Sequence, residues 1–216
     1  MPVTAGVGKI KVVAFDCDGV LFDSRASNAA YYNQILAHFG RPPMAPSAVD
    51  YVHAHTVNES IAYLFSDLVD LSEVLAYCRQ LDYRQFIPLM LPEPHIREFL
   101  EFLRGRFSTA VATNRTTTTR AVFAYHGLTE YFDLIVSALD VQHPKPHPDQ
   151  FQKIFHHFGI GPAEAIYFGD SKVDEEFARN AGVRLVAFRN PALQADYYLD
   201  SFADGPALIQ SLTATI

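Results

Sequence analysis

Hydrophobic residues gather in five short runs that are typical of buried β-strands. Segments with apolar residues at helical spacing separate the last four runs, and each is followed by a glycine, a frequent helix terminator. The runs are Ile10 to Phe15, Phe107 to Thr113, Asp133 to Ser137, Ala165 to Phe168 and Arg184 to Phe188, and the helical segments are Thr117 to His126, Pro148 to Phe158 and Asp174 to Ala181. This alternation predicts an α/β fold, a Rossmann-like three-layer α/β/α core with a parallel sheet.

The interval between the first two runs is too long for an ordinary connection. It extends from about Phe22 to Pro94 and shows helical spacing without strand alternation. The helical patterns are Ser27 to Phe39, Ala48 to Phe65 and Ser72 to Phe86, with a break in the middle. We therefore expect a core of residues 1–22 and 95–216 and an inserted, all-helical cap domain of residues 23–94 that opens and closes over a site.

Composition narrows the possible partners and compartments. The chain has 216 residues, 49% of them hydrophobic, and 17 Lys and Arg against 24 Asp and Glu give a net charge of -7 without a dense basic run. Binding to a nucleic acid backbone is therefore disfavoured. Membrane binding is not expected either, because no stretch approaches the ~20 consecutive apolar residues that span a bilayer. Met1 to Lys9 lacks the long apolar segment of a secretory signal, so we expect a cytoplasmic protein.

Two aspartates follow the first apolar run directly, in the sequence Asp16-Cys17-Asp18-Gly19. Residues two apart on an extended segment project from the same face, and ligands of open α/β sheets bind beyond the carboxyl ends of the strands. Two like charges so close are stable when a cation lies between them or when one carboxyl keeps its proton. The alternative is an Asp-Gly turn without chemistry. Cys17 is interpreted as a core residue rather than a redox group.

Polar groups recur at the ends of later strands, which favours the chemical interpretation. Thr113 and Asn114 end the second strand just before a helix N-terminus, a potential anion site. Lys145 lies among three prolines after the third strand. Asp170 ends the fourth strand, and Asp174 follows one helical turn later. This number of carboxylates suits Mg²⁺.

Together these residues resemble the four motifs of the haloacid dehalogenase superfamily of phosphohydrolases, in the phosphoglycolate-phosphatase-like branch with a helical cap. Asp16 to Val20 resembles the first motif and Thr113-Asn114 the second. Lys145-Pro146 resembles the third, and Gly169-Asp170 with Asp174 the fourth. The resemblance covers essentially the whole chain.

The resemblance implies a Mg²⁺-dependent phosphatase acting on a small phosphorylated metabolite. Asp16 would attack phosphorus and Asp18 would be the general acid and base, while Thr113 and Lys145 bind the transferring phosphoryl group. Asn114 and Arg115 are further candidates for binding substrate or phosphate, and Arg115 would either bind a second anionic group of the substrate or be solvated. The metal ligands would be Asp16, the Asp18 main-chain carbonyl, Asp170 and Asp174, the last directly or through water. The substrate would be phosphoglycolate-like, a sugar phosphate or a nucleotide, and an acid at Asp18 favours phosphate esters over haloacids.

Two other functions remain open. A phosphomutase of the β-phosphoglucomutase type would share the core, but such enzymes carry a cap histidine where this chain has Asn28. A non-catalytic phospho-ligand binding protein would be expected to lack at least one catalytic group. Hydrolysis is therefore favoured.

Several peripheral residues are weaker candidates. Arg25, Asn28 and Tyr32 are expected near the substrate because they follow the catalytic loop closely. The pairs His53 with His55 and His143 with His147 lack a third ligand at suitable spacing, which disfavours zinc. The cap aromatics Tyr31, Tyr32, Tyr51, Tyr63 and Phe65 are interpreted as a small core, and we expect a monomer or weak dimer.

Overall fold

The computed structural model describes residues 9–54 and 56–213, which divide into two compact units. The sheet unit contains the chain up to Phe22 and from Pro92 onwards. The helical unit contains Asp23 to Leu91. Within the described ranges, no helix has both the length and the hydrophobicity required to cross a bilayer.

Six parallel strands form the sheet of the sheet unit. Their spatial order is β5 (Leu134–Val136), β4 (Ser108–Ala112), β1 (Val12–Phe15), β6 (Ala165–Gly169), β7 (Arg184–Phe188) and β8 (Tyr197–Leu199). The predicted Rossmann-like fold is confirmed, and the five apolar runs correspond to five of these strands. The sequence did not predict β8, because this edge strand has three residues and Tyr198 in its middle is exposed.

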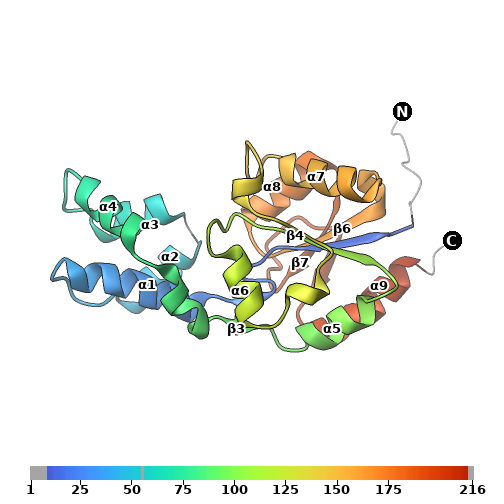
Figure 1. Cartoon of the computed structure of the whole chain (residues 1–216), viewed down its shortest axis with the longest axis horizontal. Helices are drawn as coiled ribbons and strands as arrows, with labels where there is room; N and C mark the ends of the chain where they lie inside the picture. The colour runs from blue at the N-terminus through green and yellow to red at the C-terminus, as the bar shows by residue number, and fades with distance from the viewer. Residues whose placement is uncertain (1–8, 55, 214–216) are drawn as a thin grey trace. The chain divides into compact units, whose positions relative to one another are not determined.

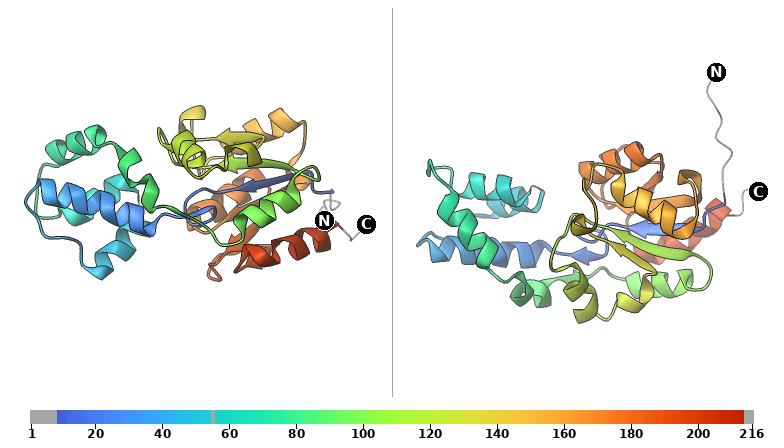
Figure 2. Two further views of the ribbon diagram at one scale, coloured as in Figure 1. Left: turned by 60° about the horizontal axis from the view of Figure 1, so that its bottom comes forward. Right: turned by 45° about the horizontal axis from the view of Figure 1, so that its top comes forward.

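Helices cover both faces of the sheet, as Figures 1 and 2 show. On one face α7 (Asp149–Phe158) and α8 (Lys172–Ala181) pack on side chains such as Val12, Ala14 and Tyr167. On the other face α5 (Ile96–Leu103) and α9 (Gly205–Thr213) lie side by side, and α6 (Thr119–Tyr125) follows β4. Short 3₁₀ turns lie at Thr129–Tyr131, Ala138–Asp140, Pro162–Glu164 and Phe202–Asp204.

Aromatic packing fixes the second face of the sheet. Phe15 stacks on Phe168 of the adjacent strand with ring centroids 5.0 Å apart, and Phe99 of α5 packs edge-on against Phe15 at 6.0 Å. Each of these phenyl groups is fully buried, which contributes about 1.5–3 kcal/mol relative to exposure. The central strands β1 and β6 are therefore anchored from both sides, so their carboxyl ends have little freedom to move.

The helical unit contains α1 (Arg25–His38), α2 (Pro46–Ala54), α3 (Val57–Leu64), α4 (Ser72–Gln80) and a 3₁₀ helix, η1 (Tyr83–Leu89). The predicted segment Ala48 to Phe65 is two helices, because Thr56 starts α3 with a capping box to Glu59. The core of this unit includes Tyr31, Tyr32 and Phe65, as expected, whereas Tyr63 is 42% exposed and stacks on Tyr51.

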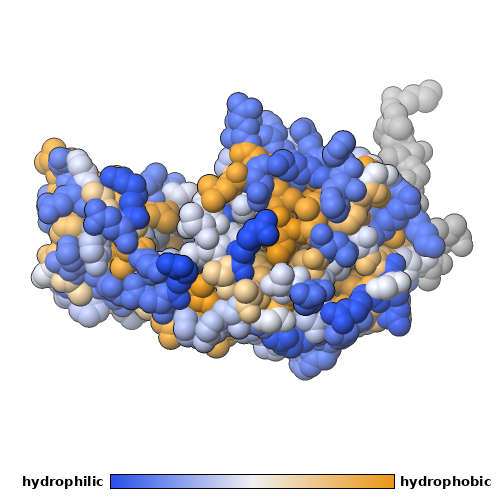
Figure 3. Space-filling view, in the orientation of Figure 1, coloured by the Kyte–Doolittle hydropathy of each residue, from blue (hydrophilic) through white to orange (hydrophobic). Residues whose placement is uncertain are grey.

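Hydrophilic residues are spread widely over the visible surfaces of the chain (Figure 3).

Two short strands, β2 (Phe22–Asp23) and β3 (Leu91–Pro92), form a separate two-stranded sheet. The chain passes from one unit into the other along each of these strands. The two segments that join the units are therefore paired with each other rather than independent.

His95 adopts a backbone conformation that favours glycine. Its φ angle is 64°, and its exposed side chain forms no capping hydrogen bond with α5. The left-handed region costs a residue with a Cβ about 1–2 kcal/mol.

We therefore expect His95→Gly to raise the free energy of unfolding by about 0.5 kcal/mol or more, the penalty removed being partly offset by the greater freedom of glycine in the unfolded chain. Urea unfolding of the intact protein measures this change. The matched control is Glu98→Gly inside α5, which should lower stability by about 1 kcal/mol. A loss of stability in His95→Gly would show that the imidazole makes a stabilising contact of its own.

Candidate active site

The carboxyl ends of the central strands bring the predicted polar side chains to one edge of the sheet. Asp16 follows β1, Thr113 follows β4 and Asp170 follows β6. Lys145 comes from the loop before α7, and Asp174 lies in the first turn of α8. Asp16, Lys145, Asp170 and Asp174, which are far apart in the sequence, thus meet in a single cluster within the sheet unit.

Lys145 lies at the centre of this cluster. Its ammonium group donates to Asp16 Oδ1 at 2.7 Å, to Asp174 Oδ1 at 2.8 Å and to the Tyr167 hydroxyl at 2.9 Å. The lysine side chain is 3% exposed, so these contacts are poorly screened by water. The ammonium group of Lys145 therefore faces the acids.

Asp174 accepts hydrogen bonds at both carboxylate oxygens. Oδ1 accepts from Lys145 and from the Tyr167 hydroxyl at 2.7 Å. Oδ2 accepts from the Ser171 hydroxyl at 2.5 Å and from the Ser171 and Asp170 amides at 3.1 and 3.3 Å. The fully buried carboxylate of Asp174 therefore holds Lys145, Tyr167 and Ser171 in place through these hydrogen bonds.

Two glycines provide the space that these carboxylates occupy. Gly19 has a φ angle of 81°, and a Cβ at this position would collide with the carboxylate of Asp170. A Cβ on Gly169 would collide with the side chain of Asp174. The close approach of acids from β1, β6 and α8 thus requires glycine at both positions.

Burial raises the pKa values of the clustered acids, and Lys145 opposes this rise to a different extent at each. Burial, partly opposed by Lys145, raises the pKa of Asp16 to about 7. Burial and the charges of Asp174 and Asp16 raise the pKa of Asp170 to about 8. Burial alone would also raise the pKa of Asp174, but Lys145 and the other donors hold it below its usual value. Despite its burial, Lys145 has a raised pKa because Asp16 and Asp174 stabilise the ammonium form.

The acidic cluster fits a divalent cation with oxygen ligands. One carboxylate oxygen from each of Asp16, Asp170 and Asp174 lies within 4.8 Å of the other two. These are hard oxygen donors, and a cation between them would relieve the repulsion that raises the pKa of Asp16 and Asp170. Asp16 and Asp170 are the more available ligands, since both oxygens of Asp174 already accept several hydrogen bonds.

Asp18 has different hydrogen-bond partners from Asp16, although its charge still acts on Asp16 and Asp170. Its carboxylate is 33% exposed and pairs with Arg115. Strand alternation does not extend this far, because β1 ends at Phe15 and the chain turns through residues 17–19. The role of the Asp18 main-chain carbonyl as a metal ligand stays a prediction.

The predicted phosphate-binding residues of the second motif are held by hydrogen bonds within the sheet unit. Thr113 is buried, and its hydroxyl oxygen accepts from the Arg115 amide at 3.1 Å. The Asn114 side chain donates to the carbonyl of Lys145 at 2.9 Å, which ties the second motif to the third. Phosphate binding by Thr113, Asn114 and Arg115 therefore stays a prediction.

Tyr167 and Ser171 are site residues that the sequence reasoning missed. Tyr167 lies within an apolar run, which gives no sign that its hydroxyl contacts Lys145 and Asp174. The capping box of α8, in which Ser171 precedes Asp174 by three residues, was the available signal for Ser171. Cys17 is fully buried, and burial raises the pKa of its thiol, in agreement with a core position.

Asp149, a carboxylate that could be a third ligand, accompanies the pair His143 and His147, contrary to expectation. Asp149 lies 2.7 Å from His147 Nδ1 and 3.3 Å from His143 Nδ1. Asp149 follows His147 by only two residues, so the sequence spacing does not indicate a shared site. In the structure Asp149 begins α7, and its carboxylate lies beside the loop that carries the two histidines. His53 is partly buried, and His55 lies outside the described residues.

The candidate substrate residues of the helical unit make contacts within that unit. Arg25 pairs with Asp50, and Asn28 Oδ1 accepts from the Tyr83 hydroxyl at 2.9 Å. Tyr32 is 4% exposed, and burial raises its pKa to about 12. Their predicted roles toward a substrate stay predictions.

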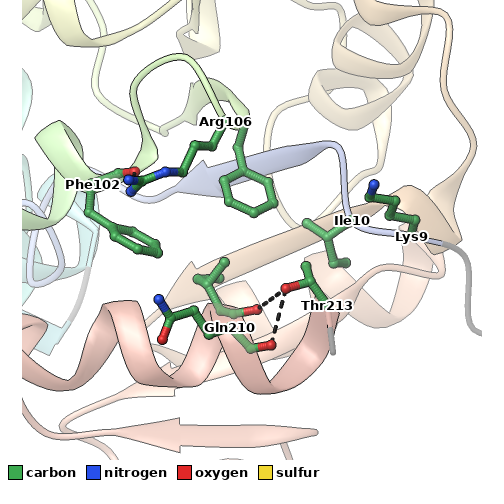
Figure 4. A pocket seen from close by; sticks show the side chains of 8 residues that line it. Lys9, Ile10, Phe102, Arg106, Gln210 and Thr213 are labelled. Atoms are coloured by element: carbon green, nitrogen blue, oxygen red, sulfur yellow. Dashed lines mark hydrogen bonds between the residues drawn. The ribbon is translucent and has the colours of Figure 1, made fainter. Parts of the chain in front are cut away.

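A pocket of about 480 Å³ lies elsewhere in the sheet unit, near the amino end of β1 and the helices α5 and α9 (Figure 4). Its lining includes Phe102, Arg106 and Gln210, and the Thr213 hydroxyl contacts the carbonyls of Ile209 and Gln210. The lining contains none of the clustered carboxylates, so the pocket is separate from the candidate site.

Comparison with known proteins identifies the class of enzyme to which this site belongs. The chain belongs to the haloacid dehalogenase-like hydrolase family, whose model matches residues 13–188. A subfamily IA hydrolase of that superfamily from Geobacter sulfurreducens has a similar crystal structure, with a TM-score of 0.83, 37% identity and coverage of 92% of this chain and 99% of that one.

Two characterised relatives are more distant in sequence. The fructose-1-phosphate phosphatase YqaB of Escherichia coli is 26% identical, covering 81% of this chain and 94% of the relative. The pyrophosphatase PpaX of Bacillus velezensis is 25% identical, covering 91% of this chain and 94% of the relative.

The raised pKa values predict how a divalent cation stabilises the protein at different pH. Without metal, folded Asp16 and Asp170 retain protons up to about pH 7 and 8 that the unfolded chain releases above its carboxyl pKa of 3.8. Their contribution to stability is therefore greatest below that value and is lost as the pH rises to about 8. A cation replaces these protons, so we expect the rise in Tm on replacing EDTA with Mg²⁺ to be larger at pH 8 than at pH 5.

Differential scanning fluorimetry at the two pH values measures this difference. Asp170→Asn should remove most of the metal-dependent shift, whereas Asp200→Asn, at an exposed position, should keep it. If the rise in Tm on adding Mg²⁺ is the same at pH 5 and pH 8, Asp16 and Asp170 are not the groups whose protons the metal replaces.

The space at Gly19 yields a separate prediction. Gly19→Ala should lower the free energy of unfolding by about 1–2 kcal/mol for its positive φ angle and should also weaken the metal-dependent rise in Tm, because the added methyl displaces Asp170. Gly105→Ala is the matched control, since Gly105 has a φ angle of 72° and open space around it. If both variants respond to metal like the unaltered protein, the carboxylate does not need this space.

Proposed function

We propose that this protein is a Mg²⁺-dependent phosphatase that hydrolyses a small phosphate monoester through an aspartyl-phosphate on Asp16. The observation that carries the proposal is the contact of a buried ammonium, Lys145, with Asp16 at 2.7 Å, beside two further acids at the carboxyl edge of the sheet. This combination provides a nucleophile, a cation for phosphoryl oxygens and a metal site. Each is required for transfer of a phosphoryl group to a carboxylate.

In the first chemical step, a carboxylate oxygen of Asp16 forms a bond to phosphorus while the bond from phosphorus to the leaving oxygen breaks. Asp18 gives its proton to that oxygen, which leaves as an alcohol. In the second step Asp18, now ionised, takes a proton from water as the water oxygen attacks phosphorus. The bond to Asp16 breaks, phosphate is released and both aspartates return to their initial states.

Lys145 and Thr113 are proposed to bind the phosphoryl oxygens. The transition state spreads negative charge over these oxygens, so a fixed ammonium stabilises it more than it stabilises the free substrate. Three partners hold Lys145 in place, so little rearrangement is required during reaction. Asn114 supports the same loop through the Lys145 carbonyl.

Mg²⁺ would be held by Asp16, Asp170 and the Asp18 main-chain carbonyl, with Asp174 as a further ligand, direct or through water. When bound, the ion supplies positive charge that keeps Asp16 ionised and screens its repulsion from the phosphate. Oxygen ligands in this number favour Mg²⁺ over softer metals.

The relatives support a phosphorylated small molecule as substrate. YqaB is named for a phosphate ester of a sugar and PpaX for hydrolysis of pyrophosphate. Residues 23–94 are proposed to be the cap, which would select among phosphoglycolate-like, sugar and nucleotide substrates. A phosphomutase would need a proton-transferring group near Asn28, and the Asn28 amide, bonded to Tyr83, does not provide one.

Phosphate release from a panel of phosphate esters with Mg²⁺ tests the proposal. We expect Asp16→Asn to lower kcat at least about a thousand-fold, because an amide is a poor nucleophile toward phosphorus. Asp200→Asn, the same chemical change at an exposed position, should leave kcat unchanged. Turnover that survives in Asp16→Asn would contradict the assigned nucleophile, and isomerisation of a sugar phosphate without phosphate release would support a mutase.

A further inference from the structure

Two histidines and an aspartate form a second cluster of potential metal ligands, outside the candidate active site. Asp149 Oδ1 lies 2.7 Å from His147 Nδ1, and Asp149 Oδ2 lies 3.3 Å from His143 Nδ1. One ligand atom of each residue lies within 4.8 Å of the other two, and the centroids of the two imidazole rings are 4.6 Å apart. The proposed reaction uses none of these three side chains.

The spacing and the chemistry of these atoms suit a cation of the Zn²⁺ class. Nitrogen and oxygen ligands at about 2.0–2.1 Å from a tetrahedral ion lie about 3.4 Å from one another, so small side-chain rotations bring the three atoms to this separation. Two imidazole nitrogens favour Zn²⁺, Ni²⁺ or Cu²⁺ over Mg²⁺, which prefers oxygen ligands. The cluster therefore differs in kind from the carboxylates of Asp16, Asp170 and Asp174.

The loop between the two histidines is held in place by side chains from other elements. Asn114 donates to the carbonyl of Lys145 at 2.9 Å, and Asn180 donates to the carbonyl of Pro146 at 3.0 Å. The three prolines of the segment 143–148 restrict its backbone further. Little backbone freedom is therefore lost when a ligand binds, which favours affinity.

The contacts within the cluster are compatible with binding of a metal ion. Both Nδ1 atoms face the Asp149 carboxylate, and a bound cation contacts these same nitrogen and oxygen atoms, while each neutral imidazole keeps its one proton on the other ring nitrogen. The side chains of His143 and His147 are 55% and 50% exposed. An ion can therefore reach the cluster from solvent, and water can complete its coordination.

We propose that His143, His147 and Asp149 bind a cation of the Zn²⁺ class, with water in the remaining position. The sequence spacing alone disfavours zinc because it shows no third ligand, and the fold supplies one at the start of α7. Lys145 lies between the two histidines in the chain, so the ion links both ends of the loop that carries the central ammonium of the candidate active site. The proposal does not depend on the phosphatase function.

Isothermal titration calorimetry with ZnCl₂ tests this proposal on the intact protein, which is freed of metal with EDTA, dialysed and supplied with excess Mg²⁺. We expect a single Zn²⁺ to bind each chain. His143→Ala and His147→Ala should each weaken this binding at least about 10-fold, because one ligand is lost. In differential scanning fluorimetry, Zn²⁺ should raise the Tm of the unaltered protein by at least about 2 °C and should not raise that of His147→Ala.

Two further variants are controls. His156→Ala removes an exposed imidazole from the last turn of the same helix, and the affinity for Zn²⁺ should stay within about 2-fold. Asp170→Asn alters the acidic cluster, and its affinity for Zn²⁺ should also stay within about 2-fold. The replaced histidines of the cluster are exposed, so we expect their variants to fold, and circular dichroism checks this for each protein.

Three results would overturn the proposal. If Zn²⁺ binds His143→Ala and His147→Ala as tightly as the unaltered protein, the histidines are not ligands. If the binding is lost in Asp170→Asn and kept in the histidine variants, the zinc lies at the acidic cluster. If the unaltered protein shows neither heat of binding nor a rise in Tm, the three side chains form hydrogen bonds with each other and hold no metal.

Discussion

The candidate site depends on one buried ammonium group. Lys145 contacts Asp16, Asp174 and Tyr167, which come from β1, α8 and β6, so a single side chain connects three elements to the loop before α7. Two unit charges 4 Å apart repel by roughly 4 kcal/mol near a protein surface. The ammonium holds the pKa of Asp174 below its usual value and opposes the rise that burial causes in the pKa of Asp16. The same charge that makes the fold of this edge possible is the one proposed to bind the transferring phosphoryl group.

The sheet brings these groups together because its central strands cannot move independently. β1 pairs with both β4 and β6, and Ala14 lies level with Ala110 and Tyr167 in the register. The side chains that follow the strands therefore emerge side by side. Gly19 and Gly169 then allow Asp170 and Asp174 to approach closely. Backbone geometry and the absence of two side chains thus set the separation of the acids, and electrostatics sets their protonation.

Sequence reasoning predicted the parts of the molecule that depend on continuous patterns. Buried parallel strands are apolar along their whole length, so five were recognised, whereas the short edge strand β8 and the helix α9 give weak patterns and were missed. The meeting of Asp16, Lys145, Asp170 and Asp174 followed from topology, since carboxyl ends share one edge. Tyr167 was missed because a buried tyrosine in an apolar run looks like core until its hydroxyl finds partners. The bond from Arg115 to Asp18 joins residues 97 positions apart, and it depends on a turn that no local pattern describes.

Two aspartates separated by one residue thus acquire different chemistry from their surroundings. Asp16 is the more buried and is held by an ammonium, whereas Asp18 is 33% exposed and is held by a guanidinium. A nucleophile benefits from burial beside fixed positive charge, because water does not compete for its oxygens. An acid and base must exchange a proton with water in every cycle, which requires exposure. The chain turns at residues 17–19, so the different surroundings of the two carboxylates arise from backbone conformation rather than from residue type, and the roles proposed for them follow these surroundings.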